Sequence, residues 1–592
     1  MQFIDAIDDI TEIAKSAIWI ALICLTISTV KAAPPHPELL KDITTGKTSV
    51  PFFASHLDEM RAKGISSSQP FRQFSHNKFH DINHDSSVDI QGVSRTPDYV
   101  GQFKVLAILV NFTDHTNSTV ATFFDSLVFG HTGITVADYY DEVSYGQVDL
   151  VTVNLPSSLG WQTAPQPYAY YVNGENGTGG YPTNSQKLVE DLVDQIDPLV
   201  DFSQYDNNSD GFVDVLMVIH SGKGAEFTGS DDDMWSHKWG ISSRYRDGVF
   251  ISDYTIQPEY LNISGDMTIG VYAHELGHVF GLPDLYDTDY SSNGVGRWCI
   301  MSYGSWLGPN GLGGVPAHFC AWCKSQIGML TPVNVASNTS NQNIPHVEGN
   351  SVAYRLWNAG NIGNEYFLVE NRQKVGYDTY LPGSGLLIWH VDESRSGNDQ
   401  EWYPGLSATS HYEVALEQAD GFFEIEKDID NGDNGDPFPG VYNQTSFNAM
   451  TVPNSDSYSE TTSYVNIDNI SSSGSTMYAD LLVGFSAGSN DDNAEEPTLP
   501  VSAQLEQNYP NPFNPTTTIC FSGDNTRPAT VEVYNSMGQK VAIIFDGYAQ
   551  SGKTSVTWDG TNNNGSPVSS GVYFYKLRNG DYEQTRKMVL IR

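Results

Sequence analysis

The chain has little cysteine, little positive charge and no long apolar run. Its 592 residues include only 5 cysteines, which excludes a protein built on a disulfide framework. There are 30 Lys and Arg against 71 Asp and Glu, so the net charge is −41. This charge excludes nucleic acid and anionic membranes as partners, because both attract basic surfaces. The longest apolar stretch, residues 17–30, is too short for an ordinary membrane span.

The short apolar stretch has the length of a signal-peptide core instead. A plausible small-residue cleavage site ends at Ala32, although the residues before the stretch are acidic where a basic segment is usual. We expect a signal peptide over residues 1–32, no transmembrane anchor in the mature protein, and a propeptide or spacer over residues 33–99. That segment contains no cysteine, so any latency would use a carboxylate such as Asp81 or Asp85, or steric cover.

The central motif reads His-Glu-Leu-Gly-His-Val-Phe-Gly-Leu-Pro-Asp and begins at His274. Two histidines four residues apart on a helix lie on one face and can bind one metal ion. Gly281 allows the chain to turn back, so Asp284 can supply the third ligand. Three protein ligands leave one zinc position open for water, and Glu275 is placed to act on that water. The alternative is an ordinary helix with two surface histidines.

A second motif follows around Met301. The run from Trp298 to Trp306 resembles the Met-turn that lies beneath the metal in metzincin-type peptidases. Alone, Met301 would be read as a core methionine. In astacin-like and serralysin-like metzincins a tyrosine lies two residues later, near the zinc. Tyr303 has this spacing, so it either donates to the oxyanion in catalysis or simply packs beside the tryptophans.

Together these motifs resemble the catalytic domain of immune inhibitor A-type secreted bacterial metallopeptidases. Further similarities lie in residues 136–146 and 365–372, whereas Cys299 departs from the family, which often has an acidic residue there. The resemblance implies a secreted zinc endopeptidase with Glu275 as general base and protein or peptide substrates. A catalytically inactive, peptidase-fold adhesin is the alternative.

The pattern of apolar residues predicts a multidomain chain. Strands at 104–112 and 213–219, alternating with helices at 136–145 and 185–196, indicate an α/β domain, metzincin-like by resemblance, over residues 100–330. Short strands then predict a β-rich region over residues 331–484, packed on the catalytic domain. In it, His390 is expected to be a core histidine rather than a ligand.

Two acidic loops suggest calcium as a second cofactor. Residues 206–214 follow the first part of an EF-hand loop but lack its final glutamate. Residues 428–436 are a second acidic, glycine-containing loop. Either loop can also be a plain turn. The expected ligands are Asp206, Asn208, Asp210, Phe212 and Asp214 in the first loop, and Asp428, Asp430, Asp433 and Asp436 in the second.

Outside the leader the cysteines are Cys299, Cys320, Cys323 and Cys520. Cys320 and Cys323 are one helical turn apart, but no second such pair completes a structural zinc site. We expect buried thiols, with a disulfide from Cys299 to one of the pair left open.

The chain ends in a separate module. A polar linker over residues 485–503 precedes residues 504–592, whose alternating strands predict a small β-sandwich. Its opening motif at residues 505–515, the Trp558-Asp559-Gly560 turn and the basic tail resemble the C-terminal sorting domain of type IX secretion, which is related to an immunoglobulin-like fold. This resemblance implies a protein that reaches the cell surface or the medium through the periplasm and the type IX machinery, and we expect it to be a monomer. An adhesive β-sandwich is the alternative.

Overall fold

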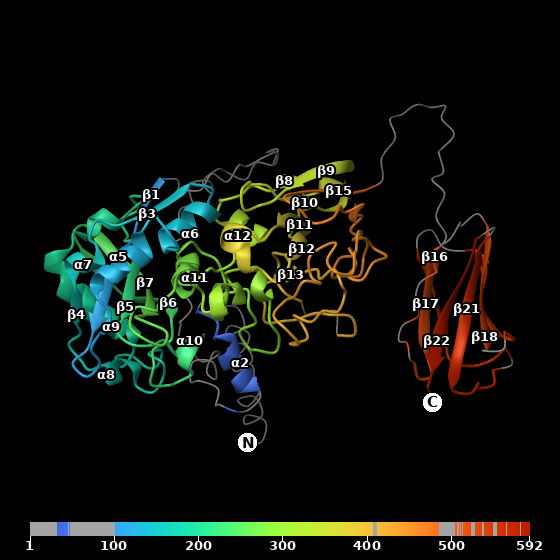
Figure 1. Ribbon diagram of the computed structural model, residues 1–592, viewed down its shortest axis with the longest axis horizontal. Coiled ribbons are helices and arrows are strands. Elements are labelled where there is room, and N and C mark those ends of the chain that lie inside the picture. The colour runs from blue at the N-terminus through green and yellow to red at the C-terminus, as the bar shows by residue number, and fades with distance from the viewer. Residues whose placement is uncertain are drawn as a thin grey trace, which may run out of the picture. The chain divides into compact units, whose positions relative to one another are not determined.

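The computed structural model describes residues 32–44, 47, 101–406, 411–484 and, with short gaps, 504–591. It contains two compact units, Met1–Ser486 and Ala487–Arg592 (Figure 1). The division falls inside the predicted linker, which lies outside the described residues. The predicted signal peptide up to residue 31 and the latch candidates Asp81 and Asp85 also lie outside them. No helix among the described residues is long and apolar enough to cross a membrane.

The first unit is organised around a five-stranded sheet with the order β4-β2-β5-β7-β6. Strands β4 (Trp161–Thr163), β2 (Leu106–Asn111), β5 (Leu216–His220) and β7 (Val249–Pro258) are parallel, and β6 (His237–Arg246) pairs antiparallel at the edge. The predicted apolar strand at 104–112 is β2. Its side chains alternate between two cores, because both faces of a parallel sheet are covered.

Helices cover both faces of this sheet (Figure 1). Helix α9 (Ser185–Ile196), whose bounds match the prediction, packs its apolar residues into one core. Helices α6 (Val136–Val143) and α11 (Ile269–Val279) pack into the other. Among the described residues the remaining α-helices of the unit are α2 (Pro37–Thr44), α5 (Ala121–Phe129), α7 (Pro156–Leu159), α8 (Tyr168–Val172), α10 (Ala225–Thr228) and α12 (Ala321–Gln326). Strands β1 (Gly101–Lys104) and β3 (Val148–Val151) form a small parallel pair.

Beyond residue 330 the same unit is β-rich, as predicted. One sheet has the order β13-β12-β11-β10-β8 and a second has the order β14-β15-β9. His390 on β12 is a buried, hydrogen-bonded residue: Nδ1 lies 3.0 Å from Glu417 and Nε2 lies 3.1 Å from Glu365. The strands are β8 (Val333–Asn334), β9 (Thr339–Pro345), β10 (Tyr354–Leu356), β11 (Glu365–Arg372), β12 (Gly385–Asp392), β13 (Val414–Leu416), β14 (Asn466–Asp468) and β15 (Thr476–Leu482).

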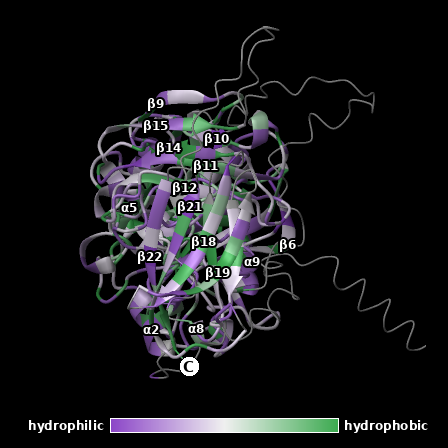
Figure 2. Cartoon of the chain, turned by 90° about the vertical axis from the view of Figure 1, so that its right-hand side faces the viewer, coloured by the Kyte–Doolittle hydropathy of each residue, from purple (hydrophilic) through white to green (hydrophobic). Residues whose placement is uncertain are grey.

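The second unit consists of two antiparallel sheets with one shared core. One sheet is β16-β17-β20 and the other is β19-β18-β21-β22. Residues of both sheets, such as Phe521, Trp558 and Tyr575, join this core, while Figure 2 shows a hydrophilic stretch on β22. The strands are β16 (Gln504–Leu505), β17 (Thr517–Ser522), β18 (Pro528–Asn535), β19 (Lys540–Tyr548), β20 (Lys553–Trp558), β21 (Gly571–Asn579) and β22 (Tyr582–Leu590).

Candidate metal centre

Helix α11 carries the first two predicted ligands and lies entirely inside the protein. Its position is fixed from several sides: Tyr140 donates from its hydroxyl to the carbonyl of Ala273, and Tyr272 donates to Pro258 at the end of β7. The chain reverses after the helix at Gly281, whose φ of 95° is readily adopted only by glycine. This turn brings Asp284 back to the helix.

The three predicted ligands meet at one point. His274 Nε2 lies 3.1 Å from His278 Nε2 and 3.2 Å from Asp284 Oδ1, and His278 Nε2 lies 3.3 Å from the same oxygen. The side chains are buried, with Asp284 only 4% exposed. A tetrahedral zinc with bonds of about 2.0–2.1 Å separates its ligand atoms by about 3.3 Å, so the triangle has the size that zinc requires.

The hydrogen bonds of the two rings determine which nitrogens face the centre. His274 Nδ1 lies 2.8 Å from the carbonyl oxygen of Ile300, and His278 Nδ1 lies 2.9 Å from that of Leu282. A carbonyl only accepts, so Nδ1 carries the proton of each neutral ring and Nε2 presents a lone pair. Two lone pairs and a carboxylate oxygen therefore face one another, and a cation satisfies all three.

Glu275 lies beside this triangle, fully buried. Neither of its carboxyl oxygens has a hydrogen-bond partner among the described residues. Burial raises the pKa of Glu275 well above its ordinary value, and the carboxylates of Asp284 and Glu226 raise it further. Burial raises the pKa of Asp284 as well, whereas charge and hydrogen bonds from His278 and His274, when their rings are protonated, lower it below the usual range. A base beside an ionised ligand is the layout that water activation needs.

Met301 lies directly against α11. A Cβ atom on Gly277 would come within 2.6 Å of the Met301 sulfur, so the helix approaches the turn closely at this point. The same turn orients the site, because the carbonyl of its preceding residue, Ile300, accepts the hydrogen bond from His274. The amide of Leu285 donates to the Met301 carbonyl, which connects the turn to the segment that follows Asp284.

The described N-terminal segment runs through the site, a contact that the sequence did not reveal. The Ala32 amide donates to Asp284 Oδ2 at 3.2 Å, and the Ala32 carbonyl oxygen lies 3.3 Å from His274 Nε2. Ala32 also forms an antiparallel bridge with His237 at the start of β6. Further along, the Ala33 carbonyl accepts from Trp235 Nε1 and the Pro34 carbonyl accepts from Trp306 Nε1.

A tyrosine that the sequence did not single out, Tyr286, contacts the segment at the ligands, and the predicted Tyr303 lies beside it. The Tyr286 hydroxyl donates to the Ala32 carbonyl at 2.8 Å. The Tyr303 hydroxyl is buried without a hydrogen-bond partner among the described residues, and its charged neighbours are Asp287 and Asp428. Sequence spacing within the Met-turn pointed to Tyr303, whereas Tyr286 comes from the turn that supplies Asp284.

The first acidic loop is closed by its own side chains. Asp206 accepts from the amides of Asp210 and Gly211, Asp210 accepts from Phe212, and Asp214 accepts from Asn207. Burial raises the pKa of Asp214 to about 7. Within the described residues, the carboxylates of this loop do not form a group with oxygens within 4.8 Å of one another.

The second acidic loop gathers a different set of carboxylates from the one predicted. Oxygens of Asp433 and Asp436 lie within 4.8 Å of Asp420, and Asp430 and Asp433 group in the same way with Glu424. Asp428 is the exception and instead accepts a hydrogen bond from Asn293 at 3.0 Å. Asp420 and Glu424 were missed because they precede the loop and reach it only through the fold.

Two parts of the chain match known families. Residues 98–330 match the immune inhibitor A peptidase M6 catalytic domain, and residues 507–591 match the secretion system C-terminal sorting domain. The pre-pro-metalloprotease PrtV of Vibrio cholerae serotype O1 is 36% identical over 199 residues, 28% of this chain and 21% of that protein. Immune inhibitor A of Bacillus thuringiensis subsp. alesti is 36% identical over 184 residues, 25% of this chain and 26% of that protein. The aligned part spans only about a fifth to a quarter of either relative.

Among solved structures, OgpA from Akkermansia muciniphila is 10% identical with a TM-score of 0.21, and covers 86% of this chain and 97% of its own. Latent PorU from Porphyromonas gingivalis is 17% identical with a TM-score of 0.15, and covers 22% of this chain and 12% of its own. Scores this low support no statement about the fold. The two family matches carry the identification: residues 98–330 are an immune inhibitor A peptidase M6 catalytic domain and residues 507–591 a secretion system C-terminal sorting domain, which points to an extracellular or cell-surface protein.

Proposed function

We propose that the chain is a secreted zinc endopeptidase in which His274, His278 and Asp284 hold the metal. The observation that carries the proposal is the triangle of two bare imidazole nitrogens and one carboxylate oxygen, 3.1–3.3 Å apart and buried. When bound, zinc would polarise the scissile carbonyl and lower the pKa of a bound water to about 7. An inactive, adhesive peptidase fold is not favoured, because every ligand and the adjacent base are in place.

Glu275 is the general base in this mechanism. Its carboxylate takes a proton from the attacking water and passes it to the departing amine. Burial and the neighbouring Asp284 carboxylate raise its pKa, which makes it a stronger base than an exposed carboxylate.

The substrate binds in an extended form along β6. Among the described residues this strand is one of the two edges of the five-stranded sheet, and the N-terminal segment pairs with it through Ala32 and His237. A protein or peptide chain that adds to the edge in the same way would place one peptide bond at the ligand triangle.

Residues 33–44 act as a propeptide that covers the site. If signal cleavage removes Ala32, contacts from Ala33 onward still hold the segment: the Ala33 amide donates to the Ser236 carbonyl, and His36 contacts Gly311. Latency is then steric, one of the two modes expected from the sequence.

A synthetic peptide of residues 33–44 should inhibit the activated enzyme competitively, and a scrambled peptide should not. Equal inhibition by both peptides would contradict this role.

The finer fold assignments belong to the same proposal. We take the catalytic domain to be metzincin-like, supported by Met301 beneath α11, and the C-terminal unit to be an immunoglobulin-like sandwich, supported by its two sheets around one core. We retain calcium as a second cofactor of the acidic loops, and a monomer exported by the type IX machinery.

Glu275→Gln provides the test. The variant should keep its zinc and its melting temperature but lose proteolysis, because only the proton acceptor changes. Wild-type activity should disappear with a chelator and return with zinc. Loss of zinc in the variant, or near-normal turnover, would contradict the role of Glu275. Chelator-resistant proteolysis by the wild type would contradict the metal mechanism.

A further inference from the structure

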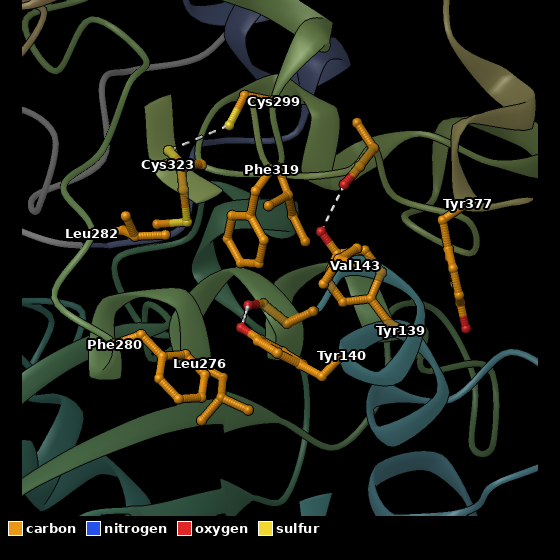
Figure 3. Close-up of a cluster of buried hydrophobic side chains, with 14 of the residues drawn as sticks. Tyr139, Tyr140, Val143, Leu276, Phe280, Leu282, Cys299, Phe319, Cys323 and Tyr377 are labelled. Atoms are coloured by element: carbon orange, nitrogen blue, oxygen red, sulfur yellow. Dashed lines mark hydrogen bonds between the residues drawn. The ribbon is translucent and has the colours of Figure 1, made fainter. Parts of the chain in front are cut away.

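Three cysteines that are distant in sequence meet beneath the Met-turn. Cys299 precedes Met301, and Cys320 and Cys323 lie at the start of α12. All three side chains are fully buried, and their sulfurs lie within 4.8 Å of one another. Cys299 and Cys323 belong to the same apolar cluster as Phe319 and Leu282 (Figure 3).

The spacing of these sulfurs matches a metal site better than a disulfide. Cys299 Sγ and Cys323 Sγ are 3.8 Å apart. A disulfide requires about 2.05 Å, whereas a tetrahedral metal with metal–sulfur bonds of about 2.3 Å holds its sulfurs about 3.8 Å apart. The Cys320 amide donates to Cys299 Sγ at 3.3 Å, a contact that favours the thiolate form at this position.

We propose that Cys299, Cys320 and Cys323 bind a thiophilic closed-shell cation, Zn²⁺ or Cu⁺. Thiolate ligands select these ions, and binding displaces the thiol protons to solvent. The ion would connect the segment before the Met-turn to α12 and so support the floor of the catalytic centre. This site is separate from the His274, His278 and Asp284 triangle.

Metal analysis of the purified full chain tests this site. The wild type should contain one more equivalent of zinc or copper than Cys323→Ser, and Cys520→Ser, which changes the cysteine of the other unit, should match the wild type. Elemental analysis separates the two ions. If Cys323→Ser does not fold, Cys299, Cys320 and Cys323 of the native wild type should resist alkylation until a thiophilic chelator is added. A disulfide in intact-mass analysis, or three thiols without the extra metal, would overturn the proposal.

A separate observation concerns the acyl oxygen of Ala32. It lies 3.3 Å from His274 Nε2, which carries no proton, and accepts a hydrogen bond from Tyr286 at 2.8 Å. The following amide, of Ala33, donates to the Ser236 carbonyl oxygen at 3.2 Å and also lies near the Glu275 carboxyl group. The peptide bond between Ala32 and Ala33 thus lies at the centre with its carbonyl oxygen toward the ligands.

We infer that Tyr286 is a catalytic residue that donates a hydrogen bond to the oxyanion of the scissile peptide; this inference depends on the proposed peptidase function. Oxyanion donors act from about 2.7–3.1 Å, and a neutral phenol remains a donor at pH 7. Asp284 and Tyr286 come from one turn, so the same backbone positions both groups. Tyr303, with its ring 6.0 Å from that of Tyr286, provides a matched control.

Tyr286→Phe should fold normally, because the only hydrogen bond of its hydroxyl among the described residues goes to the covering segment. In the activated, zinc-loaded enzyme we expect kcat to fall about ten- to a thousandfold with KM and zinc content nearly unchanged. The Ki of a peptide phosphonate should rise by the same factor as kcat/KM falls, because the phosphonate mimics the tetrahedral oxyanion. Tyr303→Phe should change neither quantity.

The outcomes separate the two levels of the proposal. An unchanged kcat in Tyr286→Phe, or a lower kcat with an unchanged phosphonate Ki, would overturn the role of Tyr286 while leaving the peptidase intact. A wild type without zinc-dependent cleavage and without phosphonate binding would overturn the proposed function itself.

Discussion

Gly277 shows how one residue sets the distance between the catalytic helix and the turn below it. Glycine is usually unfavourable inside a helix, by about 1 kcal/mol relative to alanine. Here its missing side chain leaves room for the Met301 sulfur, and Phe319 lies close to the same point. Glycine at this position therefore lowers helix propensity but allows α11 to pack closely against Met301.

Gly277→Ala should destabilise the protein even though alanine is the better helix former. The added Cβ would lie 2.6 Å from the Met301 sulfur, and overpacking of this kind costs about 1–3 kcal/mol, more than the helix gain. Thermal unfolding should show a lower Tm, and metal analysis should show a reduced zinc content. Gly180→Ala, where a Cβ meets no atom within 4 Å, is the control and should leave both unchanged.

At the scale of elements, we expect the carboxylates of the acidic loops to couple calcium binding to stability. Asp214 is the last residue of the first loop, and burial raises its pKa to about 7. The folded state then binds a proton more tightly than the unfolded chain, whose Asp titrates near 3.9. Without calcium this group stabilises the fold below about pH 4, and its contribution is lost as the pH rises to about 7. Calcium would replace that proton.

We therefore expect added calcium to raise the Tm more at pH 8 than at pH 5, because only the folded, deprotonated loop binds it. Asp210→Ala should reduce this response if the first loop is the site. Asp433→Ala, which changes the second loop, is the matched variant. A full response in Asp210→Ala with a loss in Asp433→Ala would assign the effect to the second loop. A response equal at both pH values would exclude Asp214 as the coupled group.

At the scale of the whole molecule, the proposed catalytic residues and the sorting domain lie in separate compact units. The proposed ligands and Glu275 lie within the first unit, and the sorting domain is the second. A unit with its own core is expected to fold without its neighbour.

A chain that ends at Gly484 should fold and cleave protein in vitro but accumulate in the periplasm of a host with type IX secretion. Fractionation and immunoblotting measure its distribution. Full-length Glu275→Gln is the control and should be released normally, because sorting does not require catalysis. Normal release of the truncated chain would contradict the assigned role of the C-terminal unit.

Much of this architecture was encoded locally and could be predicted. The spacing of His274 and His278 is a property of any helix, and the glycine at 281 specifies the turn that returns Asp284. The helical spacing of the apolar residues in 185–196 predicted the bounds of α9. The apolar run at 104–112 predicted a strand that is covered on both faces. Such patterns survive without tertiary context because they reflect the geometry of a single element.

Tertiary structure decided everything that depends on residues distant in the chain. Spacing pointed to Tyr303, but the fold brings the hydroxyl of Tyr286 to the peptide at the ligands. Cys299 meets Cys320 and Cys323, and Asp420 and Glu424 join the carboxylates of the second acidic loop. Ala32 contacts Asp284 at the centre although the two residues are 252 positions apart in the sequence. These contacts are set by how the Met-turn, α12 and the sheet edge pack together, and no local period in the sequence records that packing.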